Sequence, residues 1–367
     1  MNDEVDNMKF LFASDSFKGT LSSRRTAELL TQAAGEIFPG CSCASIDIAD
    51  GGEGTTEAVL SAVNGARVSL TVKGPLWEET SGFYGNLDGT RAVMEMAAAS
   101  GLPLVPCNKR DPRKTTTYGT GQMIADALEK GFRDISIAIG GSATNDGGIG
   151  CMRALGVKFL DENGEELPGC GEDLINIRSI DVSGLDPRVK RCNFTVMCDV
   201  TNPLCGESGA TYTFGKQKGG TPEILDELEK GMCNYRDILF RQFGINMDNV
   251  PGSGAAGGLG AALMVFLNGT LKSGIETVLD LVEFDRKLNG VSLVVTGEGA
   301  TDWQSVFGKV MQGVGVHCKR QGIPAVAIVG SMGQGAEDIF DYGIDSMITT
   351  VNGIMPLDEA LERAEEL

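Results

Sequence analysis

Short apolar runs alternate with segments of helical spacing at both ends of the chain. The run KFLFAS at residues 9–14 predicts a buried strand, and residues 21–38 carry apolar side chains three and four positions apart, which predicts a helix. Thr20 or Ser22 is expected to cap that helix. Further strands are expected at 43–50, 292–299, 324–331 and 345–351, and further helices at 53–63, 308–320 and 357–367.

The middle of the chain has a different pattern. Polar and apolar positions alternate between residues 66 and 97, and LDGT at 87–90 is typical of a hairpin turn, so antiparallel strands are expected there. We therefore predict an α/β protein with a discontinuous Rossmann-like parallel-sheet domain, residues 8–71 plus 291–367. A second, mixed α/β domain is inserted at residues 72–290. A cleft between two such domains would be the natural ligand site.

Composition excludes several classes of function. The net charge is −19 and no Lys/Arg cluster is present, so nucleic acid is not an expected partner. No apolar run is long enough to span a membrane, and the acidic start MNDEVDN does not resemble a secretion signal. The ten cysteines form no CxxC pair, which indicates reduced thiols and a cytoplasmic protein. The single histidine, His317, is expected on a helix surface or in packing. Monomer and homo-oligomer both stay open.

Glycine and acidic residues occur together in three loops, each after a predicted strand. These are IADGGEGT at 48–55, GGSATNDGGIG at 140–150 and VTGEGATDWQ at 295–304. Loops at the carboxyl ends of parallel strands are where ligands bind in open α/β folds. Without side chains, backbone N–H groups can approach a phosphate, and carboxylates such as Asp50 and Glu53 suit Mg²⁺. The alternative is that glycine and aspartate only form tight turns here.

Other polar segments add candidate residues. DSFKGT at 15–20 carries Lys18, CDVTNPLCG at 198–206 carries Asp199, and TFGKQKGGT at 213–221 carries Lys218. The spacing GxGxxG occurs at 252–257, but no buried strand precedes it, so it suits an anion or close helix packing rather than a dinucleotide. Walker A and protein kinase signatures are absent. Phosphate-compatible loops with carboxylates and few lysines fit phosphoryl transfer, which depends mainly on positioning and charge neutralisation.

These segments resemble the bacterial type I glycerate kinase family (D-glycerate 2-kinase) over nearly the whole chain. DSFKG, ADGGEGT, GTGQMIADAL, GGSATNDGG, CDVTNPLCG, PGSGAAGGLG and VTGEG stand here in the family's order. The resemblance implies ATP-dependent phosphorylation of D-glycerate to 2-phospho-D-glycerate, with ATP and Mg²⁺. The chain departs from the family in two places: Ala300 and Thr301 follow GEG where the family has Arg and an aliphatic residue, and Lys216 replaces the usual Pro.

The resemblance and the loops together give a set of expected roles. Asp199 or Asp302 would take or position the proton of the acceptor hydroxyl, and Lys18 and Lys218 would neutralise a phosphate or the glycerate carboxylate. Asp50 and Glu53 would hold Mg²⁺ or substrate hydroxyls. The expected substrate- and phosphate-binding residues are Asp15, Asp50, Gly51, Gly52, Glu53, Gly140, Gly141, Ser142, Thr144, Asn145, Asp146, Asn202, Lys218, Gly252, Ser253, Gly254, Glu298 and Gln304.

Three other functions remain open at this point. One is a non-catalytic sugar-acid sensor on the same scaffold, with the missing arginine at Ala300 as its sequence feature. Another is a glycerate kinase that forms 3-phosphoglycerate. The third, a nicotinamide-dependent oxidoreductase using GSGAAG at 252–257, is the least favoured because the preceding segment is a poor strand.

Overall fold

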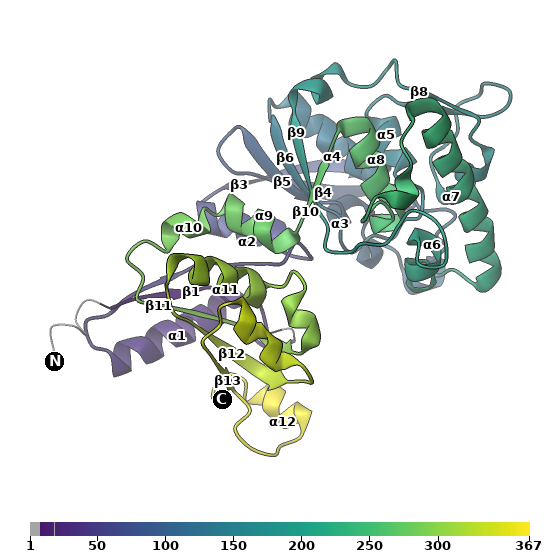
Figure 1. Cartoon of the computed structure of the whole chain (residues 1–367). Helices are drawn as coiled ribbons and strands as arrows, with labels where there is room; N and C mark the ends of the chain where they lie inside the picture. The colour runs from purple at the N-terminus through teal and green to yellow at the C-terminus, as the bar shows by residue number, and fades with distance from the viewer. Residues whose placement is uncertain (1–7, 18) are drawn as a thin grey trace. The chain divides into compact units, whose positions relative to one another are not determined.

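The structure is a computed structural model that describes residues 8–17 and 19–367. The described chain forms two compact units, each built around its own sheet (Figure 1). The first contains the described residues up to Asp50, then 57–64 and 274–367, and the second contains 51–56 and 65–273. None of the helices in the described residues has the length and apolarity needed to cross a membrane.

The first unit is a parallel α/β unit. Its sheet has the strand order β13-β12-β11-β1-β2, with every neighbouring pair parallel. Its strands are β1 (Lys9–Phe12), β2 (Ser42–Ser45), β11 (Leu293–Thr301), β12 (Ala325–Met332) and β13 (Ser346–Thr349). Its helices are α1 (Ser23–Ile37), most of α2 (Thr55–Val63), α9 (Gly274–Leu281), α10 (Phe284–Lys287), α11 (Val310–Gln321) and α12 (Leu357–Glu362).

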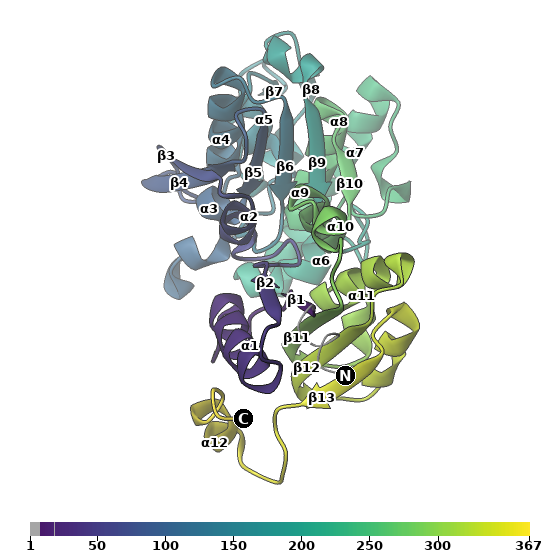
Figure 2. The same cartoon turned by 90° about the vertical axis from the view of Figure 1, so that its left-hand side faces the viewer.

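Alternation along the strands directs side chains to both faces of this sheet. Phe10, Phe12 and Val295 pack with Ala27 of α1 in one cluster. Figure 2 shows α1 and α11 on opposite sides of the sheet. The Ser22 hydroxyl accepts a hydrogen bond from the backbone N–H of Arg25. Ser22, rather than Thr20, is therefore the N-cap of α1. β1 and β11 are mostly buried, which explains why their sequences begin as continuous apolar runs, whereas β2 and β13 are largely exposed.

The second unit contains a mixed sheet of strand order β10-β9-β6-β5-β4-β3. β3, β4 and β5 pair antiparallel, as the alternating pattern predicts, and β5, β6, β9 and β10 run parallel. The strands of this sheet are β3 (Ala66–Lys73), β4 (Glu79–Asn86), β5 (Arg91–Glu95), β6 (Asp134–Ala138), β9 (Asn193–Met197) and β10 (Thr270–Lys272). β7 (Lys158–Leu160) and β8 (Ser179–Asp181) pair antiparallel in a separate two-stranded sheet of the second unit. The helices of this unit are α3 (Ala97–Ser100), α4 (Tyr118–Glu129), α5 (Ile149–Ala154), α6 (Ala210–Phe214), α7 (Pro222–Phe243) and α8 (Leu259–Leu267).

The predicted fold class is confirmed: a discontinuous parallel α/β unit carries an inserted mixed unit. The compact units divide the chain at slightly different residues from those expected. All of β3 lies in the second unit because it pairs with β4 along its whole length. α9 and α10 lie in the first unit because they pack against α11.

His317 lies on α11 and is buried, with 4% of its surface exposed. Its Nδ1 is 2.7 Å from Asp285 Oδ1 and its Nε2 is 3.2 Å from Glu276 Oε2, while its ring packs edge-on to Phe284. Partial burial alone would raise the pKa of Asp285, but the hydrogen bond and charge of His317 hold it below its usual range. His317 therefore connects α9, α10 and α11. Of the two roles expected for it, helix surface and packing, the structure shows packing.

Replacing His317 with alanine should lower the stability of the protein by about 2–4 kcal/mol, because it opens a cavity and removes two side-chain contacts. Urea unfolding of the variant and the wild type measures this loss. An unchanged unfolding midpoint in the variant would contradict the packing role.

Candidate functional site

The glycine loop at residues 140–150 follows β6 in the second unit and has two distinct parts. Gly140 and Gly141 are exposed, whereas the loop is buried from Ser142 onward. A Cβ at Gly150 would lie 2.2 Å from Thr116 Oγ1, so this glycine is required by packing. A Cβ at Gly140 would meet nothing closer than 3.9 Å, so packing does not explain the bare backbone there.

A second glycine loop, Gly51–Gly54, lies beside Gly140. The atoms closest to a Cβ on Gly140 would be Gly51 O and Gly52 Cα. Glu95, at the end of β5, is 7% exposed; it accepts the backbone N–H of Gly54 at 3.2 Å and that of Thr56 at 2.7 Å. Burial raises the pKa of Glu95 although these two hydrogen bonds oppose the shift. The Glu95 carboxylate thus accepts the backbone N–H groups at the N-terminus of α2.

Asp146 lies inside the glycine loop and is completely buried. Its Oδ2 accepts the N–H of Thr117 at 2.8 Å, the Thr117 hydroxyl at 2.7 Å and the N–H of Gly150 at 3.3 Å. Its Oδ1 accepts the N–H of Gly148 at 3.1 Å. Burial raises the pKa of this carboxyl, while the four donors favour its charged form. The structure therefore places Asp146 where it organises the loop.

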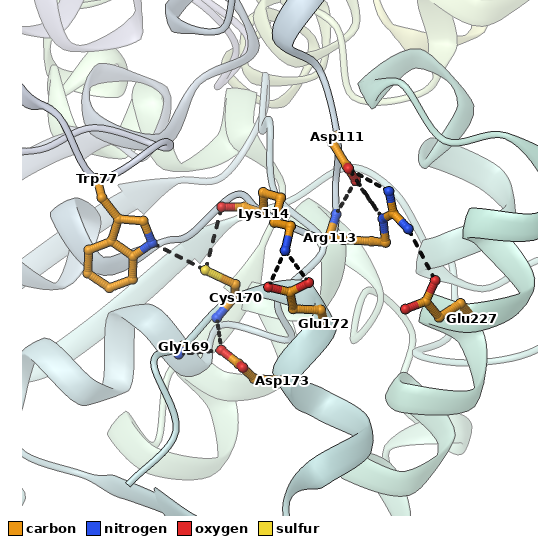
Figure 3. Close-up of polar contacts among 9 residues, drawn as sticks. All are labelled: Trp77, Asp111, Arg113, Lys114, Gly169, Cys170, Glu172, Asp173 and Glu227. Atoms are coloured by element: carbon orange, nitrogen blue, oxygen red, sulfur yellow. Dashed lines mark hydrogen bonds and ion pairs between the residues drawn. The ribbon is translucent and has the colours of Figure 1, made fainter.

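The chain segment that supplies Thr117 is fixed by a polar network on its N-terminal side (Figure 3). Arg113 binds Asp111 through two nitrogens, and this pairing holds the pKa of Asp111 below its usual range. Lys114 Nζ contacts both Glu172 oxygens, at 2.6 and 2.5 Å. The Trp77 indole donates to Cys170 Sγ at 3.2 Å. These contacts hold residues 111–117 against the Cys170 region, so the donors to Asp146 are rigidly placed.

Lys218 lies at the end of a 3-10 turn, Lys216–Lys218, and is 1% exposed. Its Nζ donates to Ser142 Oγ at 2.8 Å and to the carbonyl of Thr144 at 2.7 Å. Burial lowers the pKa of Lys218 to about 7, and the charge of Asp146 opposes that shift. The Lys218 side chain therefore supports the glycine loop from inside the protein through its hydrogen bonds to Ser142 and Thr144.

The low pKa of Lys218 predicts that stability rises with pH. Between pH 7 and the ordinary value of 10.5, the unfolded chain holds a proton that the folded protein has released, so the free energy of unfolding increases across this window. The full shift corresponds to ~5 kcal/mol at most. Chemical denaturation from pH 6.5 to 9.5 should show this rise in the wild type and not in Lys218→Met. A similar variant at the exposed Lys216 should keep it; equal slopes in all three proteins would contradict the assignment.

The two remaining loops of the second unit pack tightly together. Asn202 O accepts the N–H of Gly254 at 3.0 Å, and a Cβ at Gly254 would lie 2.1 Å from Pro203 O. Gly252 and Ser253 are also buried, and the Ser253 hydroxyl donates to Met247 O at 2.7 Å. A 3-10 turn at 247–249, not a strand, precedes this loop. The GxGxxG spacing at 252–257 was expected to serve either an anion or close packing. The contacts above show close packing.

Asp199 and Asn202 belong to the segment that follows β9. Asp199 is exposed, and Asn202 Nδ2 donates to Ser208 O at 2.8 Å. Thr144 and Asn145 of the neighbouring glycine loop are fully buried, and Asn145 Nδ2 lies 3.2 Å from Thr211 Oγ1. Of the polar residues expected to bind ligand in the second unit, Asp199 and Glu53 have exposed side chains.

The first unit contains a cavity of about 640 Å³ within the usual range for ligand pockets. Its polar part is lined by Asp15 and Asp50, which follow β1 and β2, by Glu298 in β11, and by Lys309 just before α11. Its apolar part lies between α1 and α12. The apolar lining residues are Leu29, Leu30, Ala33, Ala360, Leu361 and Ala364. The cavity thus combines carboxylates and a lysine with an apolar wall, at the strand ends where ligands bind in this fold class.

Glu298 is 6% exposed and is held by two neighbours. The Ser305 hydroxyl donates to its Oε1, and Lys309 Nζ is 3.8 Å from its Oε2. Asp302 caps the following 3-10 turn, Trp303–Val306, by accepting the N–H of Gln304 at 2.8 Å. Lys309 was not among the expected binding residues, although its place after the GEG loop could have indicated it. Lys18 lies outside the described residues.

The comparisons with known proteins agree with this architecture. The model of the Glycerate kinase family matches residues 10–367. The Glycerate 2-kinase of Escherichia coli strain K12 is 45% identical over 358 residues, 97% of this chain and 94% of its own. The Glycerate kinase of Bacillus subtilis strain 168 is 44% identical over 360 residues, 98% of this chain and 94% of its own. A crystal structure from Salmonella typhimurium LT2, described as a candidate glycerate kinase 2, superposes with a TM-score of 0.88 at 42% identity, covering 98% and 94% of the two chains.

These matches, together with a parallel α/β unit that carries a polar cavity at its strand ends, define a kinase. The chain belongs to the glycerate kinase family. Of the residues that depart from the family pattern, Ala300 lines the cavity of the first unit and is exposed, Thr301 is buried, and Lys216 is exposed on the turn that carries Lys218.

Proposed function

We propose that the protein phosphorylates D-glycerate at its 2-hydroxyl with ATP as the phosphoryl donor. The observation that carries this proposal is the 640 Å³ cavity at the strand ends of a chain in the glycerate kinase family. The relative from Escherichia coli carries the name Glycerate 2-kinase, which supports the 2-position. The ten cysteines are all free thiols, which supports a reducing compartment such as the cytoplasm.

The cavity of the first unit would take the nucleotide. Its apolar wall between α1 and α12 suits a base, and Lys309 suits a phosphate group. Three carboxylates, Asp15, Asp50 and Glu298, line the same cavity and offer the oxygen ligands that Mg²⁺ requires, so the residues fit this metal. Mg²⁺ bound there would neutralise phosphate charge. Glu53 is exposed on the loop after Asp50, where it stays a candidate for a substrate hydroxyl.

The glycine loop of the second unit would hold an anionic oxygen of the substrate. Gly140 and Gly141 present exposed backbone, and the Lys218 Nζ donates a hydrogen bond to Ser142 from beneath the loop. Asp199 is the better candidate for the general base, because its carboxylate is exposed in the same unit. Asp302, by contrast, serves as the cap of a 3-10 turn. Asp199 would accept the proton of the acceptor hydroxyl as the new phosphate bond forms.

The direct test is to incubate the purified protein with ATP, Mg²⁺ and D-glycerate, measure ADP, and identify the product by phosphorus NMR. In 2-phosphoglycerate the phosphorus couples to a single methine proton and gives a doublet. In 3-phosphoglycerate it couples to two methylene protons. ADP release with the doublet is the expected result. The methylene coupling would show that the product is 3-phosphoglycerate. Binding of D-glycerate without release of ADP would instead support the non-catalytic sensor.

A further inference from the structure

Two cysteines and a glutamate come together in the second unit. Cys205, Glu229 and Cys233 are the group of metal-binding side chains found among the described residues, and their ligand atoms all lie within 4.8 Å of one another. Glu229 and Cys233 are four residues apart on α7, so both lie on one face of that helix. Cys205 belongs to the segment between β9 and α6 and approaches this face from outside the helix.

Glu229 is incompletely satisfied in this position. Its side chain is 8% exposed, and its Oε1 accepts the backbone N–H of Gly206 at 2.6 Å. Its Oε2 is buried and has no hydrogen-bond partner among the described residues. A buried carboxylate oxygen without a donor is costly, and a cation between this oxygen and the two sulfurs would remove that cost.

A cation can reach this group from the surface. Glu229 and Cys233 line a surface hollow of about 460 Å³ between α6 and α7. Tyr212 and Asp226 line the same hollow, and the tyrosine hydroxyl donates to Asp226 at 2.8 Å, so both polar groups are already paired. The hollow therefore leaves space for water as a fourth ligand beside the three protein ligands.

We propose that Cys205, Glu229 and Cys233 form a zinc site with two thiolates, one carboxylate and one water. Thiolate sulfur selects soft or borderline metals over Mg²⁺, and zinc accepts tetrahedral sets of sulfur and oxygen. Binding of one Zn²⁺ to two thiols and one carboxylate releases two protons and leaves a net charge of −1. Zinc–sulfur bonds of about 2.3 Å place two sulfurs about 3.8 Å apart in a tetrahedron, so the group needs only a small closure.

Zinc at this position would connect the segment after β9 to α7. That segment carries Asp199 and Asn202, so the metal would fix the residues that hold the proposed general base. The role is structural, because no ligand of the site is part of the proposed reaction.

The test is zinc content and stability of the full-length protein, prepared with a phosphine reductant and equilibrated with Zn²⁺. We expect about one zinc per chain, a higher melting temperature with Zn²⁺, and a thiolate-to-cobalt charge-transfer band after Co²⁺ substitution. Cys233→Ser and Glu229→Gln should each lose at least tenfold in zinc affinity; the glutamine keeps an acceptor for Gly206 N–H. Cys205→Ser should weaken the cobalt band, because one of the two thiolate ligands is removed. If this variant does not fold, Cys233→Ser and Glu229→Gln test the proposal without it.

A matched control comes from the other cysteine pair. Cys41 and Cys43 have sulfur atoms 3.8 Å apart in the first unit but belong to no three-residue metal group among the described residues. The double variant Cys41→Ser/Cys43→Ser should keep the full zinc content. The proposal is overturned if the wild type takes up no zinc, if Cys233→Ser and Glu229→Gln bind it as the wild type does, or if the Cys41/Cys43 variant alone loses it.

Discussion

Replacing Asp199 with asparagine should lower turnover by about 10²- to 10⁴-fold, the usual contribution of a general base. The side chain is exposed in the segment after β9, so the substitution should not disturb folding. Asparagine has nearly the same shape and cannot accept the proton of the acceptor hydroxyl. Steady-state kinetics with D-glycerate and ATP measure the effect, and the loss should lie in kcat rather than in KM because the base acts in the transition state.

Asp302→Asn is the matched comparison. Asparagine caps a helical turn as well as aspartate does, so the 3-10 turn at Trp303–Val306 should persist and turnover should stay within about tenfold of the wild type. A large loss of turnover in Asp302→Asn with normal turnover in Asp199→Asn would identify Asp302 as the general base. Near-normal turnover in both variants would show that neither aspartate is the general base.

Asp146→Ala should destabilise the protein by about 3–5 kcal/mol, the largest stability effect expected here. The aspartate accepts four hydrogen bonds, from Thr117 through two groups, from Gly148 and from Gly150. Alanine leaves these donors buried without an acceptor, and the loop that carries Gly140 loses its support. Urea denaturation should show the loss, and activity should fall with it.

Thr144→Val provides the control in the same loop. The Thr144 hydroxyl is buried and has no hydrogen-bond partner among the described residues, so valine removes an unsatisfied polar group at little cost in shape. This variant should be neutral or slightly more stable. If Asp146→Ala costs less than about 1 kcal/mol, the carboxylate does not organise the loop.

Local patterns predicted the regular elements well where one face of an element is buried. The spacing of Leu29, Leu30, Ala33 and Ala34 predicted α1, and the alternation after residue 66 with the LDGT turn predicted the antiparallel strands. The strand expected at 43–50 was wrong in length, because β2 ends at Ser45. Ile46 and Ile48 beyond it are buried like strand residues, so the apolar pattern continues past the end of the pairing.

The site was predicted only in part, because a loop sequence does not show which way each side chain points. Asp146 and Lys218 looked like ligand-binding groups, yet both are buried and support the loop. Glu95 gave no signal beyond a carboxylate at the end of an apolar run, and its role depends on a contact with residues about forty positions away. Local spacing cannot show such tertiary pairings, whereas the glycine content of the loops was visible directly.

The central claim is that exposed backbone at Gly140 holds an anionic substrate. Gly140→Ala tests it most directly, because the new methyl group would lie no closer than 3.9 Å to its neighbours and should leave the melting temperature unchanged. We expect KM for D-glycerate or ATP to rise about tenfold or more, because the methyl group would keep an anionic oxygen out of hydrogen-bonding distance of the backbone N–H groups. Gly35→Ala on α1, where the added methyl group would meet no atom within 4 Å, should leave both KM values unchanged. A folded Gly140→Ala enzyme with wild-type KM for both substrates would contradict the claim.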